Sequence, residues 1–369
     1  MKKIYKNSLY NLNKQKFSHI ENYGKLDYVY RIKNKKKIKK FLETSNLKFL
    51  DQILPLKKKY NFLFPQIYIK SFDRLNKKIK NKIFFIEDYY NFSGSFKDRA
   101  SLVACLDAKE KKMKEVSVAS SGNAAISTAI FCNMFKLKCS VFIPKFTSKV
   151  KIDLLKKLGC KLFQFNLQYN DVVKKCLEYS KKNRTYNRCT GINPVTRDGK
   201  KIFSYQLISK FKKKIDYLVI PVGDGNILSG CLKGFEELYQ NKFIKYKTNF
   251  VGVQSSQSPS FYNQFINNRS EPQKNISFSK CDSINVDYPL DGYFAYKYLK
   301  KMSGFMMKID DKKIVKSREI LMKQYGINCC LASASTFAIL NNLILKKKLK
   351  NKNIFLLLTG TGYKDLGVV

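Results

Sequence analysis

The sequence predicts an α/β protein of two domains, each built on a mostly parallel sheet with flanking helices. Three observations lead to this prediction. Apolar segments of strand length alternate with segments of helix length from about Phe64 onward. The longest uncharged apolar runs, such as FLLL at Phe355, are far shorter than the roughly 20 residues of a membrane span. A chain of 369 residues is also long enough to form two domains.

The expected elements follow one another as strand–helix units. Four strands, each followed by a helix, are expected at 83–88 and 97–113, 115–120 and 121–135, 139–144 and 149–159, and 161–165 and 170–183. Next we expect the strand 217–222, a glycine turn, the helix 227–240, the strand 250–254, a long irregular region, one helix and the strand 353–360. Residues 1 to about 50 lack periodicity and hold two possible short strands, of which 25–32 is the better. Units of this kind bind ligands at the carboxyl ends of their parallel strands.

The formal charge of +45 raises the question of a nucleic-acid partner. The chain is rich in Lys, Asn, Ile, Phe and Tyr and has no Trp, which is typical of A+T-rich codon usage, and the lysines are spread from end to end. We therefore expect solvated surface lysines and no specific nucleic-acid partner, with a true polyanion site as the alternative. The N-terminal residues MKKIYKNSLYNLNKQ lack the apolar block of a signal peptide, so we expect a cytoplasmic protein with no membrane partner.

Cysteine and histidine usage excludes several classes of site. The ten cysteines contain no Cys-x-x-Cys, and the one adjacent pair is Cys329–Cys330, so neither a zinc ribbon nor a disulfide framework is expected. The single histidine, His19, excludes histidine triads and multi-histidine metal sites. We expect no metal, a reducing compartment, and acid–base work by other side chains or by a cofactor.

Among the many lysines, Lys97 has an unusual setting. It stands in SGSFKDRA, directly after Ser93, Gly94 and Ser95, and the whole motif follows an apolar strand. Small residues leave room for a bulky group beside the lysine, which opens the expected helix. Lys97 is therefore a candidate for a reactive amine, and a solvated surface lysine is the alternative.

The scarce glycines gather in one place. Four of the 17 glycines lie between Gly223 and Gly234, in a turn between a strand and a helix. Such a turn can hold a phosphate, because backbone N–H groups and the helix dipole both favour an anion there. The turn is neither GxxxxGK[ST] nor GxGxxG, so an NTPase or a dinucleotide-binding fold is not supported. The alternative is an ordinary tight turn.

Two further strand ends carry polar groups. Ser120, Ser121 and Asn123 stand at an expected helix start, where a serine N-cap is the simpler explanation. Thr359 follows a very apolar strand, and the alternative is that the strand simply ends there. With Lys97 and the glycine turn, they supply what pyridoxal 5′-phosphate requires: an amine for covalent attachment, a phosphate cradle, an amide for the ring oxygen and a hydroxyl for the ring nitrogen.

The motifs SGSFKDRA, SSGNAA, PVGDGNILSG, YGINCCLASAS and LLLTGTGYKD occur in this order, and with them the chain resembles threonine synthases. These belong to the pyridoxal-phosphate fold type II, with threonine dehydratase, cysteine synthase and tryptophan synthase β. The resemblance covers roughly residues 45–369 and implies a cofactor in a cleft between two domains. We expect a basic N-terminal extension, 1–45, a large cofactor-binding domain, 46–97 plus 189–369, a small domain, 98–188, and a homodimer.

The resemblance also implies roles for individual residues. Lys97 would hold the cofactor covalently and act as general base and acid, Asn123 would bond its ring hydroxyl, and Thr359 would face its ring nitrogen. Ser120 and Ser121 would receive the substrate carboxylate. The cofactor phosphate would be held by Gly223, Asp224, Gly225, Asn226 and Ile227. The reaction implied converts O-phospho-L-homoserine and water to L-threonine and phosphate.

The chain departs from the threonine synthase pattern in places. Ala124 stands where threonine is common, and the turn GDGN is one residue short. In NPVTRDGKK the family's arginine is displaced by one place, so either Arg197, or only Lys200 or Lys201, would reach the substrate phosphate. A threonine or serine ammonia-lyase of the same fold is the enzyme alternative, and a degenerate basic binding protein is the alternative from another class.

Overall fold

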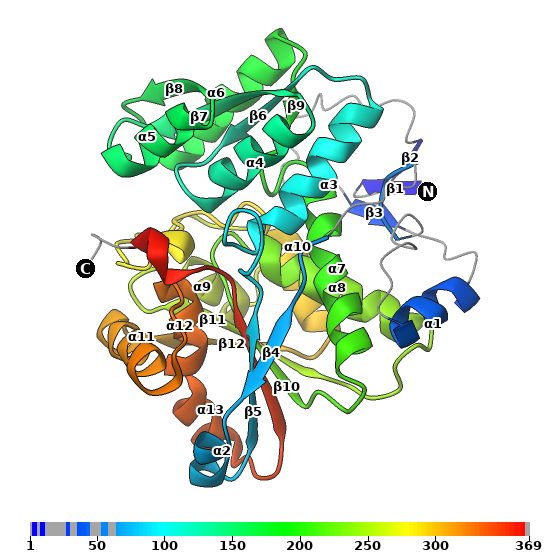
Figure 1. The fold of residues 1–369 in the computed structure, drawn as a ribbon, viewed down its shortest axis with the longest axis vertical. Coiled ribbons are helices and arrows are strands. Elements are labelled where there is room, and N and C mark those ends of the chain that lie inside the picture. The colour runs from blue at the N-terminus through cyan, green and yellow to red at the C-terminus, as the bar shows by residue number, and fades with distance from the viewer. Residues whose placement is uncertain are drawn as a thin grey trace. The chain divides into compact units, whose positions relative to one another are not determined.

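The structure is a computed structural model that describes residues 2–5, 8–11, 27–29, 35–44, 53–57 and 64–365 (Figure 1). The chain divides into two compact units. Unit 1 comprises Met1–Pro65 and Lys97–Ile202, and unit 2 comprises Gln66–Phe96 and Phe203–Val369. The domain boundaries expected from the sequence, with a small domain at 98–188, stay a prediction.

Unit 1 contains a four-stranded parallel sheet in the order β8-β7-β6-β9. Its strands are β6 (Glu115–Ala119), β7 (Lys138–Pro144), β8 (Lys161–Phe165) and β9 (Tyr186–Asn187). Its helices are α3 (Lys97–Glu110), α4 (Asn123–Met134), α5 (Lys149–Lys157), α6 (Tyr169–Lys182) and the first half of α7 (Val195–Lys210). Helices α4 and α6 pack against β6 and β7 (Figure 1), so the apolar side chains of these strands are buried between layers.

The N-terminal part of unit 1 adds a small antiparallel sheet in the order β2-β1-β3 and one helix. These elements are β1 (Lys2–Tyr5), β2 (Ser8–Asn11), β3 (Asp27–Val29) and α1 (Lys35–Thr44). The strand expected at 25–32 thus corresponds to β3. In α1 the buried residues Ile38, Phe41 and Leu42 are three and four positions apart, which is the spacing of one helix face.

Unit 2 contains a six-stranded sheet in the order β12-β11-β10-β13-β5-β4, parallel except for the edge strand β4. Its strands are β4 (Tyr68–Ser71), β5 (Lys82–Glu87), β10 (Tyr217–Pro221), β11 (Asn249–Ser255), β12 (Phe305–Ile309) and β13 (Asn353–Leu358). Its helices are α2 (Asp73–Ile79), α8 (Asn226–Gln240), α9 (Ser260–Ile266), α10 (Gly292–Lys301), α11 (Asp311–Tyr325), α12 (Leu331–Ala338) and α13 (Leu340–Lys347), with 3-10 turns η3 (Asp282–Ile284) and η4 (Gly362–Asp365).

Both faces of the unit 2 sheet are covered, as is usual for parallel sheets. On one face, alternate residues of the strands join the core beneath α12, among them Phe85, Val219 and Leu356. On the other face, the rings of Phe84 and Phe355 stack at 4.6 Å between centroids. The two parallel sheets with flanking helices confirm the predicted fold class.

Several elements were not expected from the sequence. These are α1, α2, α7, β4, β9, β12 and all but one of the five helices α9 to α13, where one helix was expected. Helix α11 does carry end signals, because the Asp310 carboxylate accepts from the N–H of Lys312 and Gly326 ends the helix at φ 63°. The region after 254 is therefore less irregular than predicted.

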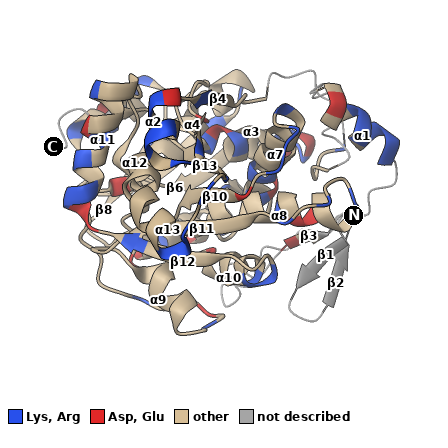
Figure 2. Cartoon of the chain, turned by 90° about the horizontal axis from the view of Figure 1, so that it is seen from below, with Lys and Arg blue, Asp and Glu red and all other residues tan. Residues whose placement is uncertain are grey.

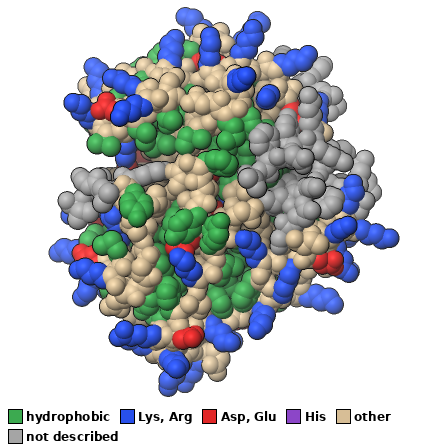
Figure 3. Space-filling model, in the orientation of Figure 1, with side chains coloured by type: hydrophobic (Ala, Val, Ile, Leu, Met, Phe, Trp, Pro, Cys, Tyr) green, Lys and Arg blue, Asp and Glu red, His purple; other side chains and the backbone are tan. Residues whose placement is uncertain are grey.

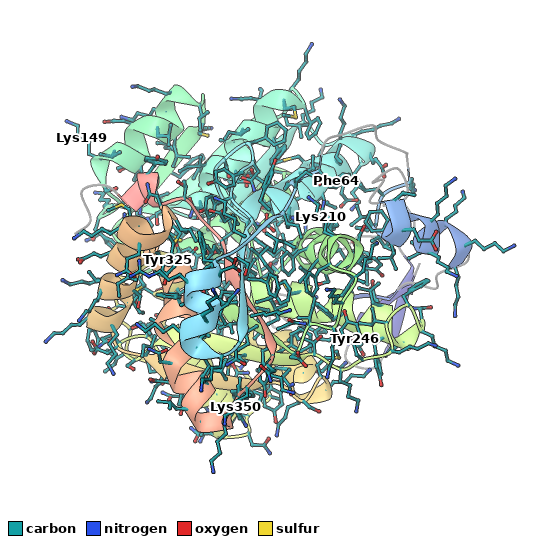
Figure 4. The ribbon with its side chains drawn as sticks, turned by 60° about the horizontal axis from the view of Figure 1, so that its bottom comes forward. Phe64, Lys149, Lys210, Tyr246, Tyr325 and Lys350 are labelled. Carbon is teal, nitrogen blue, oxygen red and sulfur yellow. The ribbon has the colours of Figure 1, made fainter. Side chains whose placement is uncertain are left out.

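Basic residues are distributed over many elements. Figure 2 shows Lys and Arg on α1 of unit 1 and on α2 and α11 of unit 2. On the face in Figure 3, Lys and Arg side chains project singly, with apolar and neutral side chains between them. Lys149 on α5 and Lys350 after α13 are exposed and point away from the ribbon (Figure 4), whereas the Tyr325 ring lies 5.0 Å from that of Phe72. This distribution fits the expectation of solvated lysines.

Candidate functional site

Three of the predicted features lie at one edge of the unit 2 sheet. Strands β10, β13 and β5 are neighbours and run parallel, so their carboxyl ends meet at the same edge. The glycine turn follows β10, Thr359 follows β13, and the segment that leads to Lys97 follows β5. These features were predicted separately, and the strand order makes them neighbours.

Packing accounts for both glycines of the turn. Gly225 has φ +88°, a left-handed conformation that favours glycine, and a Cβ there would lie 2.9 Å from Cβ of Ala295. A Cβ at Gly223 would lie 3.1 Å from the carbonyl oxygen of Ser283. The turn ends at Asn226, the first residue of α8. The first N–H groups of a helix have no intrahelical acceptor, so this start can bind an anion.

Side chains next to the turn are tied to one another. Asp224 Oδ1 accepts from the N–H of Asn226 at 3.0 Å. Asn226 Nδ2 donates to Oδ2 of the buried Asp291 at 3.0 Å, and the Ser229 hydroxyl donates to the same oxygen. Because its amide is bonded to Asp291, Asn226 would serve a phosphate mainly through its backbone. The sequence reasoning did not identify Asp291.

Thr359, buried at the end of β13, is held by Ser333 of α12. Ser333 Oγ accepts from the N–H of Thr359 at 2.7 Å and from that of Gly360 at 3.2 Å, and it lies 3.5 Å from Thr359 Oγ1. Its own proton can go to Thr359 Oγ1 or to Cys330 Sγ, 3.1 Å away. Since Ser333 Oγ already accepts two hydrogen bonds, the Thr359 hydroxyl is available to donate elsewhere. Ser333 lies in the motif YGINCCLASAS but was given no role from the sequence.

The segment before Lys97 is bound to the chain that follows β13. The N–H of Phe96 donates to the carbonyl of Thr359 at 2.8 Å, and the N–H of Thr361 donates to the carbonyl of Gly94 at 3.1 Å. Phe96 is the residue before Lys97, which is half-buried and begins α3. The backbone leading to the lysine is therefore fixed within unit 2.

The small residues of the motif shape this segment. Gly94 has φ +66°, and the N–H of Ser95 donates to Asn91 Oδ1 at 3.0 Å. The hydroxyls of Ser93 and Ser95 lie 3.0 Å apart, so one donates to the other. These contacts make a tight turn that ends at Lys97, and Asn91 was not identified from the sequence.

In unit 1 the polar loop Ser120–Asn123 follows β6. The N-cap of α4 is Gly122, with no capping side chain, and Ser120 Oγ accepts from the Gly122 N–H at 3.2 Å. The simpler explanation, a serine N-cap, is therefore wrong. Ser120, Ser121 and Asn123 are all half-buried. Neutral hydroxyl and amide groups at the start of a helix can receive a carboxylate.

The segment NPVTRDGKK forms the loop before α7 and its first two turns, and it presses on α3. A Cβ at Gly199 would lie 2.3 Å from the carbonyl oxygen of Arg99 and 2.9 Å from Cα of Ala100. Only a residue without a side chain allows this approach. The structure thus brings this segment next to the helix that Lys97 opens, and both lie in unit 1.

Arg197 and Lys201 of this segment have carboxylate partners. Arg197, 1% exposed, has Nη1 3.0 Å from Asp27 Oδ1 of β3, and Lys201 Nζ lies 3.5 Å from Asp198 Oδ1. A shift of one place on a helix turns a side chain by about 100°. Arg197 therefore points in another direction than Thr196, where the family's arginine would stand. The substrate roles of Arg197 and Lys201 stay predictions.

The residues that the structure describes include no candidate metal site, membrane-spanning helix or disulfide. Among these residues no group of three or more His, Cys, Asp or Glu side chains could hold a metal ion. None of the described helices is long and apolar enough to cross a bilayer. The ten cysteines form no disulfide.

Comparisons with known proteins agree with this arrangement. The chain is 26% identical over 282 residues to a threonine synthase of Methanocaldococcus jannaschii, covering 74% of this chain and 69% of that protein. It is similar in fold to a processed threonine deaminase of Solanum lycopersicum, with a TM-score of 0.72, 16% identity, and coverage of 95% and 92%. It is likewise similar to maize serine racemase, with a TM-score of 0.69, 15% identity, and coverage of 80% and 88%.

The family model of pyridoxal-phosphate dependent enzymes matches residues 68–360. The residues present fit that cofactor. Gly225 keeps open a helix start whose N–H groups can hold a phosphate, Thr359 can donate to a ring nitrogen, and the half-buried Lys97 has the amine for covalent attachment. With the fold, these matches show that the chain belongs to the pyridoxal-phosphate-dependent enzymes of fold type II.

Proposed function

We propose that this enzyme is a threonine synthase, a carbon–oxygen lyase that converts O-phospho-L-homoserine and water to L-threonine and phosphate. The proposal is supported by the similarity to threonine synthases over three quarters of the chain and by the motifs around Lys97 and Thr359. Bound pyridoxal phosphate withdraws electrons from the bonds at the α-carbon of an attached amino acid.

The residues of this chain would then perform three tasks. The Lys97 amine would take up and return protons at the substrate carbons, since the one histidine, His19, lies outside the motifs. Ser120, Ser121 and the start of α4 would hold the substrate carboxylate with neutral donors. The hydroxyl of Thr359, directed by Ser333, would donate to the cofactor ring nitrogen and leave that nitrogen uncharged.

The observation that carries the proposal is a group of cations beside α3. A threonine synthase must bind two phosphates, one of the cofactor and one of the substrate. In Lys97–Arg99 and Arg197–Lys201 there are five cations and two carboxylates, and Gly199 brings the two segments into contact. A dianionic phosphate group is favoured where cations exceed carboxylates.

Within this group we assign the substrate phosphate first to Lys200. Lys200 is four residues after Thr196 and so projects from the same side of α7 as the position of the family's arginine. Arg197 and Lys201 are one and five residues after Thr196, so they project from other sides of α7, and we rank them second.

The ion pairs of Arg197 and Lys201 favour the second candidate, a threonine or serine ammonia-lyase. Such an enzyme binds no substrate phosphate, and it could use Arg197 and Lys201 only to hold Asp27 and Asp198. The deciding experiment compares two product assays on the protein reconstituted with pyridoxal phosphate. Phosphate release from O-phosphohomoserine should be faster than ammonia release from threonine or serine. The reverse order would establish the ammonia-lyase.

Two variants test the roles proposed for Lys97 and Lys200. Lys97→Ala should abolish turnover and covalent attachment, and borohydride reduction of the wild type should label the peptide of Lys97. Lys200→Met should raise the KM for O-phosphohomoserine about 10- to 150-fold, as expected for one lost charge-assisted bond. Lys149→Met, on an exposed lysine of α5, is the control for the loss of one positive charge and should leave the KM unchanged. An unchanged KM in Lys200→Met would remove Lys200 from the substrate site.

A further inference from the structure

The start of α8 already has an anionic partner from its own turn. The Asp224 carboxylate accepts from the N–H of Asn226 at 3.0 Å, and the carbonyl of the same residue accepts from the N–H of Asp291 at 2.9 Å. The side-chain carboxylate and the backbone carbonyl of Asp224 are thus both hydrogen-bonded, and the side chain is half-buried at the helix N-terminus. This is the position where a carboxylate is stabilised by the helix dipole.

A phosphate bound at the same turn would use the same groups. The donors without an intrahelical acceptor are the N–H groups of the first turn, Asn226 to Leu228, and the first of these is bonded to Asp224. An N–H group that points at one oxygen cannot donate well to a second. The carboxylate of Asp291, which accepts from Asn226 Nδ2 and Ser229 Oγ, adds further negative charge behind the turn.

We propose that Asp224 competes with the cofactor phosphate for the N-terminus of α8. This chain then binds pyridoxal phosphate more weakly than it would with an uncharged residue at position 224. On binding, the phosphate either displaces the carboxylate from the Asn226 N–H or binds beside it with one donor fewer and with charge repulsion. A larger share of cofactor retention then falls to the covalent bond with Lys97. This inference rests on the glycine turn as phosphate site and not on the identity of the amino-acid substrate.

A purely structural role for Asp224 predicts a different result from competition. If the carboxylate only shapes the turn, any replacement weakens cofactor binding or leaves it unchanged. Asparagine keeps the Oδ1 acceptor for the Asn226 N–H and removes the charge. Asp224→Asn therefore separates the shape of the turn from its charge.

The test measures equilibrium binding of pyridoxal phosphate and of pyridoxal, which lacks the phosphate, from the absorbance change of the bound cofactor. Asp224→Asn should tighten binding of pyridoxal phosphate about 10-fold and leave binding of pyridoxal unchanged. Asp73→Asn, which removes one exposed carboxylate at the start of α2, is the control for net charge and should change neither. Far-UV circular dichroism checks folding, and Asp224→Ser, which also offers an oxygen acceptor, replaces the asparagine variant if that one does not fold.

The result that would overturn the proposal is equal or weaker binding of pyridoxal phosphate by Asp224→Asn. Equal tightening for pyridoxal would overturn it as well, since the effect would not involve the phosphate. Gly225→Ala separates two assumptions: that the glycine turn holds the phosphate, and that Asp224 competes with it there. If that variant changes the preference for pyridoxal phosphate over pyridoxal while Asp224→Asn does not, the glycine turn holds the phosphate and the competition is wrong. If neither changes it, the turn is not the phosphate site.

Discussion

The turns that begin α8 and α4 each follow the carboxyl end of a parallel strand, but they differ in how closely other groups pack against their glycines. At the start of α8, neighbouring groups would contact a Cβ at either glycine, and the side chains are bonded to one another through Asp291. At the start of α4, a Cβ at Gly122 would meet nothing within 4 Å. The glycines of the first turn are constrained by packing, whereas Gly122 of the second is not.

The difference matches the demands of two ligands. A cofactor phosphate stays bound through many turnovers and is served by backbone groups in a rigid turn. A substrate carboxylate enters and leaves, and we expect the half-buried hydroxyls of Ser120 and Ser121 to receive it, beside Asn123 as the expected partner of the cofactor ring hydroxyl. Substitutions in the first turn should therefore change stability together with cofactor binding, and substitutions at Ser120 or Ser121 should change only binding of the substrate.

The largest effect should come from alanine at the two glycines. Gly225→Ala forces a side chain into φ +88° and toward Ala295, and should lower the free energy of unfolding by about 2–4 kcal/mol and weaken cofactor binding. Gly122→Ala, with open space and φ −131°, should change the free energy of unfolding by less than about 0.5 kcal/mol. Urea unfolding of both variants measures the contrast. Equal losses would mean that the two turns are not built differently.

Asp291→Ala should have the next largest effect. It removes the acceptor of Asn226 Nδ2 and Ser229 Oγ in a buried position, and unsatisfied buried donors cost about 2–3 kcal/mol here. Asp291→Asn, which keeps the shape and one acceptor, is the matched control and should cost less. The measurement is urea unfolding without cofactor. A loss in the alanine variant no larger than in the asparagine variant would show that these bonds do not hold the turn.

Sequence reasoning predicted the elements next to the site well. Strands were expected at 115–120 and 161–165, and the structure has Glu115–Ala119 and Lys161–Phe165. These segments are apolar and bounded by turn residues, so local pattern is sufficient. Helix α7 was missed because residues 195–209 are buried on every side, and such a helix has no polar face to produce a 3.6-residue period.

The supporting residues of the site could not have been predicted in the same way. Asp291 is 65 positions from Asn226, Ser333 is 26 from Thr359, and Asp27 is 170 from Arg197. The partner in each case depends on the tertiary fold, and no local pattern specifies it. Motifs therefore indicated which residues would meet the ligands, while the groups that position those residues required the structure.

Ser333→Ala extends the comparison to the third strand end. It removes the acceptor of the Thr359 and Gly360 N–H groups and should cost about 1–2 kcal/mol of unfolding free energy. It should also shift the visible absorbance of the bound cofactor, because the Thr359 hydroxyl loses the neighbour that directs its proton. Ser335→Ala, a buried serine of the same helix that donates to the Ala332 carbonyl, is the control and should leave the absorbance unchanged. The same spectrum in all three proteins would exclude Ser333 from the cofactor's surroundings.

The smallest effect on stability, and the sharpest test of the open turn, should come from Ser121→Ala. Ser121 is half-buried beside Gly122, and its hydroxyl is among the groups we expect to receive the substrate carboxylate. The free energy of unfolding should stay within about 0.5 kcal/mol of the wild type, because a change outside the packed turns removes little. The KM for the amino-acid substrate should nevertheless rise about 10-fold, the equivalent of one hydrogen bond to a charged group. Cofactor affinity, measured by absorbance titration, should be unchanged. A variant that lost stability while keeping its KM would place Ser121 among the residues that build the turn, and the contrast between the two helix starts would fail at this position.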